Sequence, residues 1–403
     1  MTEPVAEPGQ TPIELVDEND RHHRQNLISW WNQSRLADAT ALVVGAGALG
    51  NELVKNLALV GIGRVIVVDM DTIENSNLSR CVFFRAEDEG RLKAEVLAER
   101  ASALNPGIEV IPVVGDVRLA LGLGVFAECD VVLGGLDNRE ARLHINMACW
   151  KTSTPLVDGA IEGLLGMMRV FLPPESACYE CTMSERDRDL LANRRTCALL
   201  SRDEMLTGKV PTTATSASVI AAMQVQEAVK LLHRNEPGSV AYTFGGKGFS
   251  FNGETHDSYI VTYGRKDDCM SHDTYAVASA DRLSPEQTVA EALTSARATL
   301  GPEAVLDLEG DFVLAAECTD CNEQSEIMRP LPAVKVKDGE CPTCGEGRQL
   351  HVTHIVDDSC VEMHQLQLKN VVAHFDVVTA RVGMERRHYV VGDGDAIETL
   401  RSN

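Results

Sequence analysis

The sequence has no long apolar run. Among its 403 residues, no apolar stretch approaches the roughly 18 residues that a membrane-spanning helix needs. The first residues, MTEPVAEPGQTPIE, are acidic and contain prolines, unlike the basic and apolar regions of a secretory signal peptide. These two absences predict a cytoplasmic protein without a membrane partner.

Positive charge is scarce. The chain has 37 lysine and arginine residues against 60 aspartate and glutamate residues, which gives a formal net charge of −23. Such a surface repels the phosphates of DNA and RNA, so the charge argues against a nucleic-acid partner. An acidic surface would suit a basic protein partner.

The sequence lacks a P-loop of the form G-x-x-x-x-G-K-[ST] but contains another glycine-rich loop, GAGALG. An apolar run at residues 41–44 leads into Gly45, Gly47 and Gly50, and residues 51–59 have helical character. A second apolar run, residues 65–68, ends in Asp69. This order is typical of a dinucleotide-binding fold, in which the carboxylate binds a ribose hydroxyl. Taken alone, the loop would favour a dehydrogenase.

The polar residues that follow do not fit hydride transfer. Asp71, Asn77, Arg80 and Lys93 come soon after the second apolar run, and Asp137 follows in VVLGGLDNREAR. Nucleotidyl transfer builds negative charge on the α-phosphate and on the departing pyrophosphate, and arginine, lysine and a carboxylate-held Mg²⁺ neutralise that charge. The alternative is that the two cations are solvated surface charges. The whole set in this order favours nucleotidyl transfer.

The stretches GAGALG, DMDTIENSNLSR, GRLKAE and GGLDN resemble the adenylation domain of ubiquitin-like-protein activating enzymes and of the related sulfur-carrier adenylyltransferases. The resemblance spans residues 21–272. It implies a Rossmann-like α/β domain with a mostly parallel sheet, and the use of ATP and Mg²⁺. In the family, the matching residues hold the ribose (Asp69), the phosphates (Asn77, Arg80, Lys93) and Mg²⁺ (Asp137).

Two groups of arginines near this set have less specific signals. The segment DRHHRQNLISWW resembles the family's short N-terminal helix, which ends in an arginine–glutamine pair. The resemblance implies that Arg24 reaches the ATP phosphates of a neighbouring subunit, and hence that the protein is a homodimer. The alternative is that Arg24 belongs to a solvated amphipathic segment. Arg139 and Arg142 fit either a substrate contact or a charged helix surface.

The chain has 12 cysteines, which without a secretion signal indicate metal binding and catalysis rather than disulfides. Cys178 and Cys181 form a C-x-x-C pair, which needs two more ligands for tetrahedral zinc. The second pair in the family is usually two cysteines, whereas this chain has Cys269 and His272 there. Imidazole is an ordinary zinc ligand, so the four residues are predicted to form a structural zinc site. The alternative is that His272 is a surface histidine.

A second set of cysteines has the spacing of a zinc ribbon. Cys318 and Cys321 are separated by 19 residues from Cys341 and Cys344. If the four cysteines of this set bind one ion, the loop that they close is shorter than a loop closed with the distant pair Cys178 and Cys181. The shorter loop costs less conformational entropy. Four protein ligands leave no open position for a substrate, so both predicted zinc sites are structural.

One remaining cysteine is a candidate nucleophile. Cys197 lies in RDRDLLANRRTCALLSRDEM, just after Arg194 and Arg195, where positive charge favours the thiolate. In the activating enzymes that this chain resembles, this crossover segment carries the cysteine that takes the modifier as a thioester. Sulfur-carrier adenylyltransferases often have a cysteine nearby too. The other four cysteines, Cys81, Cys129, Cys149 and Cys360, are not predicted to react.

The pattern changes after residue 273. With 44% hydrophobic residues the chain can bury more than one core, and we expect a flexible segment (1–20), an adenylation domain (21–273) and a C-terminal α+β module (274–403). A helix is predicted from a Ser284 cap to Gly301. Strands are predicted at residues 304–308, 311–316, 351–356, 375–382 and 388–393, with the ribbon (318–344) inserted. A ubiquitin-like fold for this module is one alternative, and another β module is the other.

The sequence therefore predicts an enzyme that activates the C-terminal glycine of a ubiquitin-like protein. The carboxylate attacks ATP to give an acyl-adenylate and pyrophosphate, and Cys197 then displaces AMP to form a thioester for a conjugating enzyme. The alternatives are a sulfur-carrier adenylyltransferase, which ends in a thiocarboxylate, and a non-catalytic scaffold subunit. The intact set from Asp69 to Asp137 argues against the scaffold.

Overall fold

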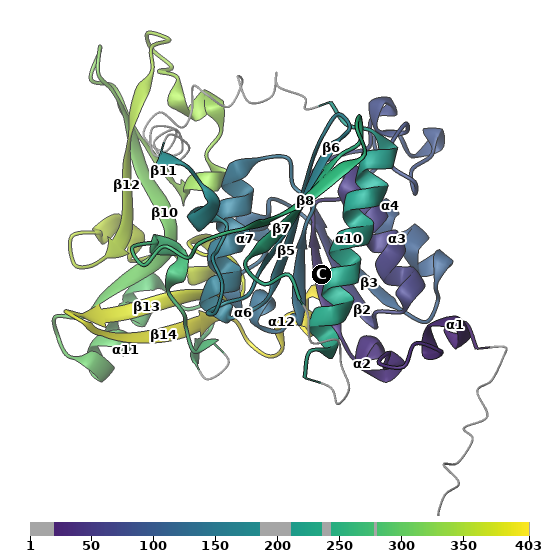
Figure 1. Ribbon diagram of the computed structural model, residues 1–403. Helices are drawn as coiled ribbons and strands as arrows, with labels where there is room; N and C mark the ends of the chain where they lie inside the picture. The colour runs from purple at the N-terminus through teal and green to yellow at the C-terminus, as the bar shows by residue number, and fades with distance from the viewer. Residues whose placement is uncertain (1–19, 186–210, 236–242, 278–279, 403) are drawn as a thin grey trace, which may run out of the picture.

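The computed structural model describes residues 20–185, 211–235, 243–277 and 280–402. An eight-stranded sheet with the order β3-β2-β1-β4-β5-β6-β7-β8 forms its centre (Figure 1). The first five strands in this order are parallel and the last three are antiparallel, which confirms the predicted α/β class. The strands are β1 (Thr40–Val44), β2 (Arg64–Asp69), β3 (Glu109–Val114), β4 (Val131–Gly134), β5 (Leu156–Glu162), β6 (Leu165–Phe171), β7 (Lys247–Asn252) and β8 (Asp257–Thr262).

Helices cover both faces of this sheet. Side chains of β1 alternate between two cores: Ala41 and Val43 pack with α3, α4 and α10, while Leu42 and Val44 pack with α5–α7. A strand buried on both faces is continuously apolar, which is why the runs at 41–44 and 65–68 were sufficient to predict β1 and β2. The helices of this domain are α1 (His23–Asn26), α2 (Gln33–Ala37), α3 (Ala48–Val60), α4 (Lys93–Leu104), α5 (Val117–Ala120), α6 (Leu123–Ala127), α7 (Arg139–Thr152) and α10 (Ala214–His233).

The C-terminal residues form a second sheet with the strand order β11-β10-β13-β14-β9. A sixth strand, β12, pairs antiparallel with β10. One helix, α11, packs on this sheet, so the predicted α+β character is confirmed. The elements are β9 (Asp281–Leu283), α11 (Val289–Leu300), β10 (Val305–Cys318), β11 (Gln324–Pro330), β12 (Arg348–Val356), β13 (Asp376–Val382), β14 (Glu385–Val391) and α12 (Ala396–Ser402).

Two sequence predictions for this module were wrong in detail. The helix begins at Val289 rather than after Ser284, because Thr288 and Glu291 form the capping box. Ser284 and Gln287 make a separate turn, in which the Ser284 amide donates to Gln287 Oε1 at 3.1 Å. The predicted strands 304–308 and 311–316 are one strand, β10, which continues through Gly310 with an irregular register.

The C-terminal module packs on the face of the large sheet that carries α5–α7. Phe375, Val377 and Val390 lie in the same apolar core as β1 and α7. Glu128 accepts hydrogen bonds from the Ala396 and Ile397 amides at 3.1 Å each, so it caps α12. Because the core is continuous, the predicted boundary at residue 274 stays a prediction.

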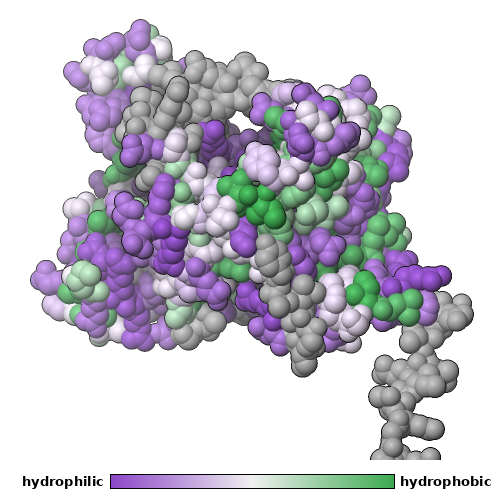
Figure 2. All heavy atoms as spheres, viewed as in Figure 1, coloured by the Kyte–Doolittle hydropathy of each residue, from purple (hydrophilic) through white to green (hydrophobic). Residues whose placement is uncertain are grey.

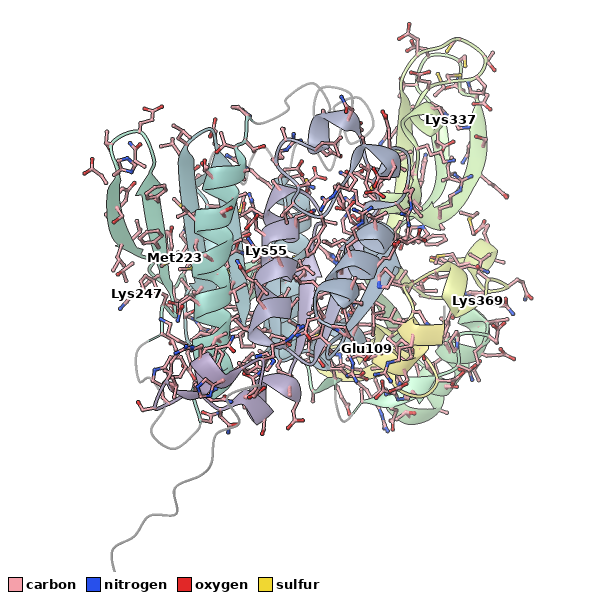
Figure 3. The ribbon with its side chains drawn as sticks, turned by 90° about the vertical axis from the view of Figure 1, so that its right-hand side faces the viewer. Lys55, Glu109, Met223, Lys247, Lys337 and Lys369 are labelled. Carbon is pink, nitrogen blue, oxygen red and sulfur yellow. The ribbon has the colours of Figure 1, made fainter. Side chains whose placement is uncertain are left out.

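The β10–β12 arm projects away from the rest of the module. Figure 3 shows Lys337 on this arm, far from Lys369 at the helical base of the module. No helix among the described residues is both long enough and apolar enough to cross a membrane.

Candidate active site

The glycine loop is a tight turn between β1 and α3. Gly45 has φ +99°, and a Cβ there would lie 2.8 Å from the Gly135 carbonyl oxygen. A Cβ on Gly50 would lie 1.8 Å from the Gly45 oxygen, whereas a Cβ on Gly47 would meet nothing within 4 Å. The turn therefore requires glycine at positions 45 and 50 and leaves open space at 47. No side chain caps α3, so its first amide groups can bind an anion.

Asp69, at the end of β2, holds this loop in place. One of its carboxylate oxygens accepts from the Ala46 amide at 2.7 Å, and the other accepts from the Asp71 amide at 2.8 Å. Burial raises the pKa of Asp69, although the nearby Lys93 and these hydrogen bonds oppose the shift. A carboxylate has about four lone-pair positions, so Asp69 can accept two ribose hydroxyls in addition.

Lys93 begins α4 and reaches the same edge of the sheet. Its Nζ lies 2.7 Å from an Asp71 carboxylate oxygen. Burial lowers the pKa of Lys93, but the attraction of Asp69 and Asp71 outweighs burial, so the pKa is raised. The lysine is therefore charged at neutral pH and can neutralise a phosphate.

Arg80 follows the single turn Asn75–Asn77. Its guanidinium donates to the Ser76 carbonyl at 2.6 Å. Burial raises the pKa of the Cys81 thiol to about 11, against the opposing charges of Arg80 and Lys93. Both cations thus lie near the same buried thiol. Asn77 itself is buried, and its Oδ1 accepts from the Glu74 amide at 3.0 Å, so its amide group also shapes this turn.

Asp137 is exposed and follows β4, next to the glycine loop. The Gly135 amide donates to the Val44 carbonyl at 2.9 Å, which ties the end of β4 to the end of β1. The strand order reverses between β1 and β4, and ligands of open α/β sheets bind at such a point, at the carboxyl ends of the strands. Gly45, Gly47, Gly50, Asp69, Asp71, Lys93 and Asp137 are therefore brought to one edge.

Two of the predicted catalytic residues are not placed at this edge. In α1, Gln25 donates to the carbonyl of Leu59, at the far end of α3, so Arg24 lies at the opposite edge of the sheet within one chain. Arg24 is therefore not part of this edge within its own chain. Cys197 lies outside the described residues.

Several polar residues that support the site were missed by the sequence reasoning. Asn51 is fully buried; its amide nitrogen donates to the Ala46 carbonyl at 2.8 Å, and its oxygen accepts from the Phe83 amide at 3.0 Å. Arg142 is a buried partner of Asp158, not the substrate contact or the surface charge that we expected. Asn51 interrupts a largely apolar segment, which is a sequence signal for such a role, whereas Arg142 lies in a polar stretch that carries no such signal.

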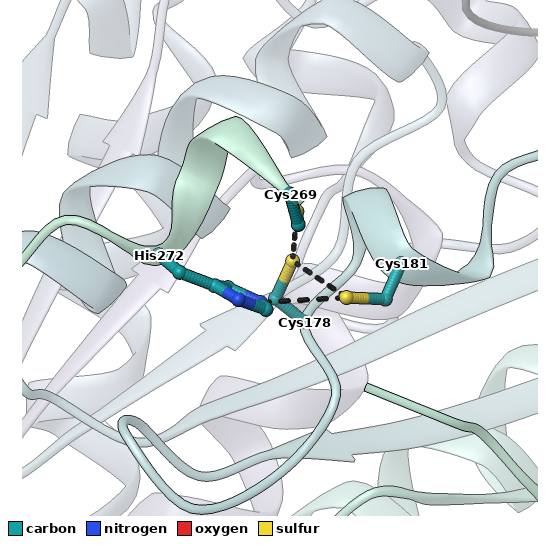
Figure 4. A group of neighbouring side chains, drawn as sticks. All are labelled: Cys178, Cys181, Cys269 and His272. Carbon is teal, nitrogen blue, oxygen red and sulfur yellow. Dashed lines mark hydrogen bonds between the residues drawn. The ribbon is translucent and has the colours of Figure 1, made fainter. Parts of the chain in front are cut away.

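The first predicted zinc set is brought together (Figure 4). The Cys178 sulfur lies 3.7 Å from that of Cys181 and 3.5 Å from that of Cys269, and the Cys181 sulfur lies 3.3 Å from His272 Nε2. Tetrahedral zinc with bonds of about 2.3 Å to sulfur places sulfur atoms roughly 3.8 Å apart. The donor set therefore fits zinc. His272 also stacks on Trp150, with ring centroids 4.4 Å apart, so it is not a free surface histidine.

The second predicted set also forms one cluster, at the end of the β10–β12 arm. Cys318 and Cys344 sulfurs lie 3.4 Å apart, and Cys321 and Cys341 sulfurs lie 3.5 Å apart. This confirms that the four cysteines of the ribbon form one set and do not share ligands with Cys178 and Cys181. The ligand atoms of each set lie within 4.8 Å of one another.

Comparisons with known proteins agree with this geometry. Residues 20–262 match the ThiF family. The chain is 32% identical to the sulfur carrier protein ThiS adenylyltransferase of Escherichia coli over 232 residues, which are 56% of this chain and 87% of that protein. It is 41% identical over 155 residues to the NEDD8-activating enzyme E1 catalytic subunit of Arabidopsis thaliana, covering 35% of this chain and 34% of that protein. The chain thus spans about a third of that relative's length.

Two further comparisons extend the similarity. The SAMP-activating enzyme E1 of Haloferax volcanii is 38% identical over 170 residues, which are 42% of this chain and 63% of that protein. The crystal structure of E. coli MccB with ATP superposes with a TM-score of 0.51 and 24% identity, covering 63% of this chain and 74% of MccB. The likeness to MccB concerns the fold alone.

Proposed function

The chain belongs to the ThiF family, and from this premise we propose that it adenylates the C-terminal carboxylate of a small ubiquitin-like protein. The observation that carries the proposal is the meeting of the glycine loop, Asp69, Lys93 and Asp137 at the switch point of the sheet. A free carboxylate is a poor electrophile at neutral pH. An acyl-adenylate is reactive because AMP is a good leaving group.

Each residue of the set has a part in this step. The amides that begin α3 and the Asp69 carboxylate bind the ATP phosphates and ribose, respectively. Arg80, Asn77 and Lys93 bind the phosphates, and the two cations neutralise the charge that builds on pyrophosphate as it leaves. Asp137 is the exposed carboxylate that would hold Mg²⁺, which when bound neutralises further phosphate charge.

The protein surface supports a protein substrate. Apolar side chains are exposed on both faces of the antiparallel end of the sheet: Ile260 of β8 and Val219 of α10 on the face that α10 covers, and Leu165 of β6 and Tyr259 of β8 on the other face. Figure 2 shows an apolar area over β8 and beside α10. Exposed apolar side chains at the edge of a sheet are a feature of protein-binding surfaces.

We further propose that Cys197 takes the activated carboxylate as a thioester and passes it to a conjugating enzyme. The likeness to the NEDD8-activating subunit supports this second step. A specific observation favours another product: the E. coli ThiS adenylyltransferase is matched over 87% of its length. A sulfur-carrier adenylyltransferase would make the same adenylate and continue to a thiocarboxylate. Arg24 would complete the site of a partner copy, which makes a homodimer part of the proposal.

The experiment that tests the adenylation step is ATP–pyrophosphate exchange. Small proteins with a C-terminal glycine, encoded near the gene, are added one at a time with ATP and labelled pyrophosphate. Exchange that requires one of them, and that disappears when its terminal glycine is removed, supports the proposal. Exchange that is independent of any carboxylate partner contradicts it.

We also expect two zinc ions per chain. The eight ligands form two closed sets, so metal analysis of the purified protein should give a ratio near two. Cys341→Ser should remove one ion and leave ATP binding unchanged, because the ribbon lies on the β10–β12 arm. Cys149→Ser, at a buried cysteine outside both sets, is the matched control. A ratio near one, or none, would refute the two-site assignment.

A further inference from the structure

We propose that Arg142 is a positioning residue that fixes the Asp137 loop (residues 135–138) for metal binding, an inference that rests on the proposed function. Arg142 lies in the first turn of α7, immediately after this loop. Its side chain turns back under the loop instead of facing solvent.

The hydrogen bonds of Arg142 join the loop to the neighbouring strand. One terminal nitrogen donates to the Leu136 carbonyl, directly before Asp137, and to the Gly159 carbonyl at 2.9 Å. Its Nε donates to Asp158 Oδ1 at 3.0 Å. One guanidinium therefore binds the residue before the candidate metal ligand and two residues of β5.

A buried side chain holds the same region from the other face of the sheet. Gln224 of α10 is fully buried, and its amide nitrogen donates to the Gly134 carbonyl at 2.9 Å and to the Val157 carbonyl at 3.0 Å. Since α7 and α10 cover opposite faces, the end of β4 is fixed from both sides. Of these two side chains, Gln224 binds the end of the strand and Arg142 reaches past it to Leu136 of the loop.

The ion pair between Arg169 and Asp158 provides an internal control. Asp158 is 1% exposed and also accepts from Arg169 Nε at 3.1 Å. Arg169 lies directly across from Asp158 on β6, and its guanidinium binds Asp158 rather than the Asp137 loop. Arg142 and Arg169 thus share one carboxylate, but only Arg142 binds Leu136.

The consequence concerns the metal. A carboxylate on an exposed loop binds a cation well only if the loop is held in one conformation, and loss of such an outer partner typically weakens metal affinity by about 10–100-fold. A lysine at position 142 keeps the charge beside Asp158. Its single nitrogen cannot reproduce the fork that spans Leu136, Gly159 and Asp158.

The test compares Arg142→Lys with Arg169→Lys in the full chain. Hydrogen exchange of the peptide containing Gly135 and Leu136 is followed by mass spectrometry, and Mn²⁺ binding is measured by electron paramagnetic resonance with a non-hydrolysable ATP analogue present. For Arg142→Lys we expect faster exchange in that peptide and about a tenfold or greater rise in the Mn²⁺ dissociation constant. For Arg169→Lys we expect the parent's values for both.

Each result has a distinct meaning. If the two variants behave alike in both measurements, Arg142 only stabilises the fold and the inference is wrong. If Arg142→Lys does not fold, Arg142→Gln, whose amide can still donate to one carbonyl, replaces it under the same criteria. Asp137→Ala separates the inference from the proposed function: unchanged Mn²⁺ binding in that variant overturns the metal assignment, whereas the exchange comparison still decides whether Arg142 holds the loop.

Discussion

Replacing Asp137 with alanine should abolish ATP–pyrophosphate exchange, lowering its rate by roughly a thousandfold or more. The carboxylate is the only acidic side chain on the loop between β4 and α7, at the edge where the glycine loop ends. Without it, the Mg²⁺ that Asp137 is proposed to hold would no longer neutralise the phosphate charge in the step that releases pyrophosphate. The side chain is exposed, so the thermal midpoint of unfolding should not change.

Glu140→Ala is the matched control for this variant. Glu140 lies in the first turn of α7, three residues beyond Asp137, and its carboxylate lies 3.6 Å from Arg118. Its loss should leave exchange within about twofold, because surface ion pairs contribute little. Exchange at the parental rate by Asp137→Ala would show that the site has been assigned wrongly.

Replacing Cys197 with alanine should remove the covalent intermediate while adenylation continues. With ATP and the cognate modifier, the parent should give a slower band on a non-reducing gel that disappears with dithiothreitol, since a thioester survives denaturant but not thiols. Cys197→Ala should lack the band and keep pyrophosphate exchange, because adenylation comes first. Cys360→Ala, at a buried cysteine of the C-terminal module, should behave as the parent.

The other results of this experiment are equally informative. A thiol-sensitive band that persists in Cys197→Ala would identify another cysteine as the acceptor. If the parent forms no band although it exchanges pyrophosphate, the reaction stops at the adenylate, and the sulfur-carrier alternative is favoured.

The parallel half of the large sheet could be predicted because its signals are local. β1 and β2 are buried on both faces and are therefore continuously apolar, and Gly45 and Gly50 mark a turn that no other residue can form. The start of α11 was misplaced because two polar pairs in succession, Ser284–Gln287 and Thr288–Glu291, both have the spacing of a cap. Only tertiary packing decides which of the two begins the helix.

The candidate site could be predicted less completely. Asp69 and Lys93 carry motifs, whereas Asn51, Arg142 and Gln224 bind backbone carbonyls that any sequence would supply. Gln224 contacts Gly134, 90 residues away, so no local pattern connects the two. On α10, the helical spacing predicts one buried face with Ala222, Val225, Val229 and Leu232; the last three are buried, whereas Ala222 is exposed and the neighbouring Ala221 is buried instead.

The central claim is that this chain converts a protein carboxylate into an acyl-adenylate. The most direct measurement is the intact mass of a glycine-terminated partner after brief incubation with ATP, Mg²⁺ and Cys197→Ala, which lacks the proposed acceptor thiol. The account predicts a partner heavier by one adenylyl group at its C-terminus, and no such species with Asp137→Ala. A partner of unchanged mass under conditions in which the protein binds ATP and turns over pyrophosphate would contradict it.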